Sequence, residues 1–156
     1  MSALALGAFA ETASAQSKPI LTVVDADGSV REFSDPDLKA LEWFQIDTHT
    51  IWTEGQRQFR GPLLRDILLG QGLQRDDVYD HEIQLLALND FMVTMPASDA
   101  WDYDVILARE MDGSLMRVRD KGPLWVVYPR DDVPELQDRI TDERWVWQLM
   151  RITILP

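Results

Sequence analysis

One stretch of the sequence, Phe59-Arg60-Gly61-Pro62-Leu63-Leu64-Arg65-Asp66-Ile67-Leu68-Leu69-Gly70, carries the clearest local signal in the chain. A Gly-Pro pair opens it, Leu64, Ile67 and Leu68 form an apolar stripe at helical spacing, and Gly70 closes it. The pattern therefore predicts one amphipathic helix.

On both sides of this helix the sequence has the segment lengths and turn residues of short strands and small helices, without an internal repeat or a long linker. Ser34 is placed to cap a short helix that runs to Leu41, and Ser98 to cap a helical turn that ends at Trp101. The predicted strands are residues 20–24, 30–33, 44–51, 82–88, 91–95, 105–110, 115–118, 124–128 and 151–155.

Length and charge limit the kind of protein. A chain of 156 residues with 46% hydrophobic composition supports one core and hence a single domain. The formal net charge of −12 repels phosphate backbones and anionic lipid headgroups, so we expect neither nucleic acid nor direct membrane insertion. The sequence has no cysteine, which excludes disulfides and thiolate ligands.

The N-terminus indicates export. An apolar run over residues 3–10 is followed by Ala13-Ser14-Ala15, a small-x-small cleavage signal, so residues 1–15 resemble the end of a signal peptide and residues 16–156 the mature domain. We expect a bacterial periplasmic protein. The basic region that normally opens a signal peptide is missing, since the first basic residue is Lys18. Either the true start codon lies upstream or the segment is not an export signal; a buried N-terminal helix is the alternative.

An ordered set of motifs gives a more specific indication. They are Phe59-x-Gly61-x-x-Leu64-x-Asp66-x-Leu68, Ala87-x-Asn89-Asp90-Phe91, Met111-Asp112-Gly113-x-Leu115, Gly122-Pro123-Leu124, Val127-x-Pro129 and Trp145-x-x-x-x-x-Arg151-Ile152. In this order they resemble the molybdopterin-binding domain of the sulfite oxidase superfamily, over about residues 44–155. The resemblance implies an α+β fold that is mainly β, with a mixed sheet and short helices.

The resemblance also implies a function. In the catalytic members a cysteine ligates molybdenum, and its absence here argues against a molybdenum cofactor and against oxo-transfer chemistry. The chain looks most like small exported members that require no cofactor, bind free pterins and report to a membrane-bound sensor, such as a cyclic-dinucleotide enzyme or a histidine kinase. Two alternatives remain: a molybdopterin-dependent oxidoreductase with non-cysteine metal ligation, and a structural subunit without a ligand.

A pterin needs a carboxylate for its adjacent N–H groups, a donor for its carbonyl and an aromatic face. For the carboxylate we select Asp90, beside Asn89 at the break between two strands, although an Asn-Asp turn held by local hydrogen bonds explains the pair equally well. For the donor we select Arg119, with Lys121 shaping the same loop; a solvated charged loop is the alternative.

Aromatic and basic residues near these loops are further candidates. Trp52 lies in a polar loop without an apolar periodicity, so it is the best stacking candidate. Arg57 beside it is a candidate for gripping a side chain or carboxylate of the ligand. Tyr128 ends an apolar strand and could place its hydroxyl at the mouth of the same binding cleft. The two histidines, His49 and His81, lack a third ligand at a recognisable spacing, so no metal site is predicted.

Overall fold

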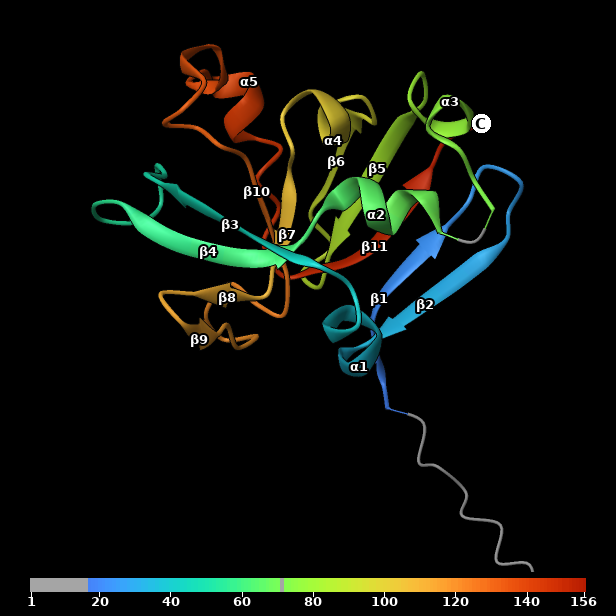
Figure 1. Ribbon diagram of the computed structural model, residues 1–156, viewed down its shortest axis with the longest axis horizontal. Coiled ribbons are helices and arrows are strands. Elements are labelled where there is room, and N and C mark those ends of the chain that lie inside the picture. Colours follow the sequence, from blue (N-terminus) through green and yellow to red (C-terminus); the bar gives the residue numbers. More distant parts are fainter. Residues whose placement is uncertain (1–16, 71) are drawn as a thin grey trace, which may run out of the picture.

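The computed structural model describes residues 17–70 and 72–156 (Figure 1). The predicted signal peptide, residues 1–15, lies outside the described residues. None of the described helices is long and apolar enough to cross a membrane.

Three sheets make up the β-structure. Their strands are β1 (Pro19–Val24), β2 (Val30–Ser34), β3 (Trp43–Thr48), β4 (Arg57–Pro62), β5 (Glu82–Ala87), β6 (Met92–Pro96), β7 (Ile106–Ala108), β8 (Glu110–Met111), β9 (Ser114–Leu115), β10 (Trp125–Val127) and β11 (Leu149–Ile154). The largest sheet has the order β2-β1-β11-β5-β6, a second has the order β3-β4-β8-β9, and β10 pairs with β7.

The largest sheet is mixed. β1 and β11 pair in parallel, whereas the other neighbours in this sheet are antiparallel. A parallel pair needs a long crossover connection, and here the whole chain between the first and the last strand supplies it. The two ends of the described domain are therefore joined in the centre of one sheet.

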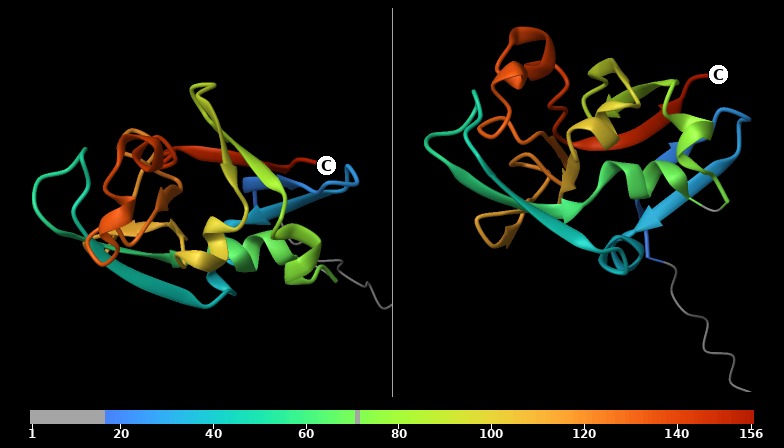
Figure 2. Two further views of the ribbon diagram at one scale, coloured as in Figure 1. Left: turned by 90° about the horizontal axis from the view of Figure 1, so that it is seen from above. Right: turned by 45° about the horizontal axis from the view of Figure 1, so that its top comes forward.

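The helices are short. They are α1 (Asp35–Lys39), α2 (Leu64–Leu69), α3 (Arg75–Val78), α4 (Asp99–Asp102), the 3₁₀ turn η1 (Pro134–Leu136) and α5 (Arg139–Asp142). Ser34 caps α1 through a reciprocal capping box with Asp37, as the sequence predicts. α5 and the loop that joins β3 to β4 lie at one end of the molecule, and β2 and α3 lie at the other (Figure 1 and Figure 2).

The predicted fold class is confirmed as α+β and mainly β, with a mixed sheet, short helices and one continuous core. The amphipathic helix is also confirmed, because Leu64, Ile67 and Leu68 are fully buried in α2. Three predicted strands are wrong in part. Residues 105–110 divide between β7 and β8, which belong to different sheets. The strands predicted over residues 44–51 and 115–118 end earlier, at Thr48 and Leu115.

Two sheets approach each other closely at Gly61. It lies in β4, where Arg109 donates a backbone hydrogen bond to the carbonyl of Arg60 at 2.8 Å. A Cβ at Gly61 would lie 2.8 Å from the carbonyl carbon of Leu107 and 2.9 Å from the Cα of Ala108. Both neighbours are backbone atoms that cannot move aside.

We therefore expect Gly61→Ala to lower the free energy of unfolding by about 1–3 kcal/mol through overpacking. Gln58→Ala on the exposed side of the same strand is the control, and should change stability by less than about 0.5 kcal/mol. Denaturant unfolding of both variants measures the difference. Equal stability of the two would show that β4 and β7 are not tightly packed.

Candidate functional site

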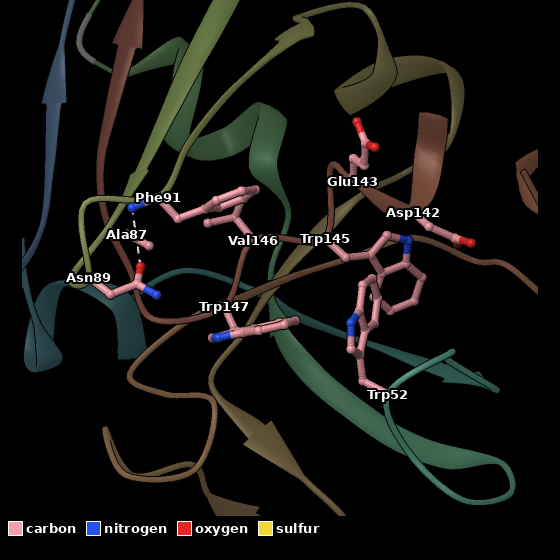
Figure 3. Close-up of a pocket in the computed structure, with 9 residues that line it drawn as sticks. All are labelled: Trp52, Ala87, Asn89, Phe91, Asp142, Glu143, Trp145, Val146 and Trp147. Atoms are coloured by element: carbon pink, nitrogen blue, oxygen red, sulfur yellow. Dashed lines mark hydrogen bonds between the residues drawn. The ribbon is translucent and has the colours of Figure 1, made fainter. Parts of the chain in front are cut away.

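A cavity of about 230 Å³ opens where three segments meet (Figure 3). The segments are the loop between β3 and β4, the turn between β5 and β6, and the stretch that follows α5. The cavity is lined by Trp52, Ala87, Asn89, Phe91, Asp142, Glu143, Trp145, Val146 and Trp147.

Indole rings form most of the cavity wall. The Trp52 ring lies 5.4 Å from Trp147 and 6.0 Å from Trp145, measured between centroids. Trp125 stands behind them in the core, 5.9 Å from Trp145 and 6.4 Å from Trp147. Phe91, half-exposed, completes the aromatic surface from the β5–β6 turn. Such rings offer flat faces and edges to a planar guest.

Backbone hydrogen bonds hold the Trp145–Trp147 segment in place. The indole N–H of Trp125 donates to the carbonyl of Trp145 at 3.2 Å, and the backbone N–H of Val126 donates to Val146 at 2.9 Å. Because β10 is fully buried, these bonds tie one side of the cavity to a strand of the core.

The opposite side is a loop held by side chains. Asp131 accepts hydrogen bonds from the backbone N–H of His49 at 3.0 Å and lies 2.7 Å from its ring nitrogen Nδ1. The hydroxyl of Thr50 accepts from the backbone N–H of Trp52 at 3.0 Å. Although burial alone would raise the pKa of Asp131, the hydrogen bonds from His49 outweigh it and hold that pKa below its ordinary value. The loop that presents Trp52 thus depends on an ionised Asp131.

Few polar groups face the cavity. Asp142, the last residue of α5, is buried and accepts a hydrogen bond from Arg130 Nε at 3.2 Å. The side-chain oxygen of Asn89 accepts from the backbone N–H of Phe91 at 3.2 Å, which leaves its amide nitrogen free of that bond (Figure 3). Glu143 is exposed. An aromatic cavity with a small number of polar groups is the usual form of a small-molecule site.

Two of the predicted site residues, Trp52 and Asn89, line this cavity. Asp90 does not. It is exposed, has a φ of 67°, and occupies a tight turn closed by the bond from its N–H to the carbonyl of Ala87 at 3.1 Å. Local hydrogen bonding therefore explains Asp90, and the carboxylates of the cavity wall are the buried Asp142 and the exposed Glu143.

The predicted basic residues lie outside the lining. Arg57 pairs with Asp112 at 2.9 Å. Arg119 is exposed on the turn that follows β9. Lys121 is closer to the site, because its ammonium lies 4.3 Å from the centroid of Trp147 and 5.3 Å from that of Trp125. It thus supports the aromatic wall without lining the cavity.

Tyr128 is a core residue and does not reach the mouth of the cavity. It is fully buried and donates its hydroxyl proton to Asp99 at 2.7 Å, while Arg144 donates to the same carboxylate oxygen at 2.8 Å. Burial, together with the negative charge of Asp99, raises the pKa of Tyr128 well above its ordinary value. The apolar residues 124–127 that precede Tyr128 predict a strand buried on both faces, and the burial of Tyr128 agrees with that pattern.

Sequence reasoning missed most of the cavity wall. The site residues predicted from the sequence do not include Phe91, Asp142, Trp145 or Trp147. Their side chains converge only through the pairing of β11 with β5, which brings Leu149 opposite Ala87. The one local signal is the concentration of aromatic and acidic residues in Asp142-Glu143-Arg144-Trp145-Val146-Trp147.

The lining does not fit a molybdenum centre. It contains oxygen and indole N–H groups but no sulfur, and molybdenum in the resembled family takes a thiolate ligand. Across residues 17–70 and 72–156, no group of three or more His, Cys, Asp or Glu side chains is arranged to hold a metal ion.

The Asp131 anchor predicts a pH-dependent loop. The pKa of this carboxyl is lowered in the folded protein, so its stabilisation is present above the ordinary value of 3.8 and is lost as the pH falls through the lower folded value. NMR signals of residues 49–56 should therefore titrate with a midpoint below 3.8. Asp131→Asn should shift the same signals at neutral pH, whereas Asp132→Asn, at the exposed neighbour, should not. An unchanged loop in Asp131→Asn would contradict the anchor.

Comparison with known proteins gives a fold and no more. No protein-family model matches the chain, and no curated protein matches it. Among solved structures, the sulfane dehydrogenase SoxCD from Paracoccus pantotrophus is similar, with a TM-score of 0.60 at 15% sequence identity. The match covers 86% of this chain but only 37% of that chain. The architecture is thus of the type expected from the resemblance to the sulfite oxidase superfamily, while the chain spans little more than a third of the enzyme it matches.

Proposed function

We propose that this chain is a non-catalytic periplasmic binding protein for a pterin or a similar small heterocycle, and that it signals to a membrane-bound sensor. The observation that carries the binding proposal is the aromatic cavity. Its volume of about 230 Å³ lies below the roughly 300–1,000 Å³ of sites for drug-sized ligands. A single bicyclic ring system suits this space.

The chemistry of the wall supports binding rather than turnover. Trp52, Trp145 and Trp147 present aromatic rings, which favour stacked or edge-on contact with a flat heteroaromatic guest. Of the polar residues in the lining, only the carboxylates of Asp142 and Glu143 are of a type that acts as a nucleophile or general base, and Asp142 already accepts a hydrogen bond from Arg130. The missing soft ligand argues against the oxidoreductase alternative.

Exposed apolar side chains beside the cavity support the proposed partner. Leu88, Phe91 and Met92 are 44%, 50% and 50% exposed, and they belong to the turn and strand that border the cavity. A ligand that orders this turn would change the surface offered to a sensor, which is the linkage that signalling requires.

Removal of one ring tests the binding proposal. We expect Trp52→Ala to weaken pterin binding about 5- to 150-fold, because one stacking contact contributes about 1–3 kcal/mol. Trp101→Ala is the matched control. Trp101 lies in α4, packs on Tyr79 and does not line the cavity. Fluorescence titration with pterin measures both dissociation constants. Equal weakening in the two variants would contradict the assignment of the cavity.

The alternative functions have distinct signatures. Stoichiometric molybdenum in protein purified without oxygen from its native source would overturn the binding proposal in favour of the oxidoreductase. A melting temperature that stays constant across a panel of pterins would favour a structural subunit, because a ligand that binds only the folded state must raise it.

A further inference from the structure

We propose that the indole N–H of Trp145 and the carboxylate of Asp142 together recognise one edge of the guest, and so select heterocycles that carry an amino-pyrimidinone ring. This inference rests on the proposed function of the cavity and deepens it. It names the two polar groups that determine which planar molecules the site accepts.

The indole nitrogen of Trp145 is a buried donor without an acceptor. Trp145 is 2% exposed, and its Nε1 has no hydrogen-bond partner among the described residues. Two other indoles in the chain behave as expected, since Trp125 donates to the carbonyl of Trp145 and Trp43 donates to the carbonyl of Leu38 at 2.8 Å. Buried donors are nearly always satisfied, so an unsatisfied one in the wall of a cavity indicates a ligand group.

Asp142 supplies the complementary acceptor. In the described part of the chain its carboxylate takes one side-chain hydrogen bond, from Arg130 to Oδ1, and the two side chains are only 11% and 18% exposed. This single contact leaves acceptor capacity at both oxygens, because an ionised carboxylate has about four lone-pair positions. The edge of the Trp145 ring that carries the nitrogen is turned toward this carboxylate (Figure 3).

The other polar residues of the lining are poorer candidates. Glu143 is exposed, and its side chain approaches Arg139 at 3.9 Å. The side-chain oxygen of Asn89 is already used within its own turn. A buried acceptor and a buried donor at one end of the cavity therefore define its recognition pattern.

An amino-pyrimidinone edge matches this pattern. Its exocyclic amino group and ring N–H are adjacent donors that a carboxylate accepts side by side, and the carbonyl oxygen next to them is the acceptor that an indole N–H requires. Lumazine lacks the amino donor. In 2,4-diaminopteridine an amino group replaces the carbonyl and would oppose the Trp145 donor, and the ring nitrogen next to it carries no proton, so one of the two donors to Asp142 is lost as well. Both have nearly the same shape as pterin, so lumazine tests the amino contact with Asp142 and 2,4-diaminopteridine tests the two polar contacts together.

Dissociation constants of these three pteridines test the inference. The wild-type protein should bind pterin more tightly than either analogue. Trp145→Phe should lose about 3- to 10-fold in affinity for pterin, and its preference over 2,4-diaminopteridine should fall by a similar factor, because one neutral hydrogen bond disappears. Asp142→Asn should lose about 10- to 100-fold and lose the preference over lumazine, since charge-assisted bonds are stronger.

Matched controls separate recognition from stability. Asp90→Asn, which changes the exposed carboxylate outside the lining, should keep the wild-type order of affinities. Arg130→Gln removes the partner of Asp142 but keeps its carboxylate, so this variant should still prefer pterin over lumazine. Should Trp145→Phe fail to fold, the wild-type protein suffices: the indole N–H signal of Trp145 should move downfield on addition of pterin but not of 2,4-diaminopteridine.

The possible failures are distinguishable. If none of the three pteridines binds the wild-type protein, the proposed function itself is wrong. If all three bind with equal affinity, or if Trp145→Phe and Asp142→Asn keep the wild-type preferences, then the cavity binds flat rings but the recognition pair is overturned.

Discussion

A single buried indole, Trp125, determines where the cavity wall stands. Its ring packs edge-on against Phe59 at 5.3 Å and against Trp145 at 5.9 Å, so it joins the β4 layer to the segment after α5. Its N–H must find an acceptor because the side chain is fully buried, and it takes the carbonyl of Trp145. That one bond uses the Trp145 backbone and leaves the Trp145 side chain to face the cavity.

The two sides of the cavity differ in how firmly they are held. The Trp145–Trp147 side continues directly into β11, whose Leu149 donates to Leu124 at 3.0 Å and lies in the central sheet. The Trp52 side is a loop fixed by Asp131 and by threonine hydroxyls. A cavity with one wall fixed to the core and one separately anchored loop allows a ligand to order the loop without disturbing the core.

Local chemistry could be predicted from the sequence, and long-range convergence could not. The cap at Ser34 and the stripe of α2 depend on residues a few positions apart, and both are confirmed. Trp52 stood out because no apolar face surrounds it. Asp90 was misleading because a polar pair between two strands suits both a turn and a cleft, and the turn satisfies it locally. Asp142 and Trp145 come to line a cavity with the β5–β6 turn because distant strands β5 and β11 pair, and no local sequence pattern encodes that pairing.

The position of Lys121 bears on the charge of the proposed ligand. An aromatic cavity in a protein of net charge −12 would at first suit a quaternary ammonium ion, which binds to the negative faces of such rings. Here the Trp147 ring already carries a cation at 4.3 Å from its centroid, and Lys121 does not line the cavity. A second cation on the same indole would be repelled at short range, where salt screens weakly. A neutral heterocycle avoids that repulsion.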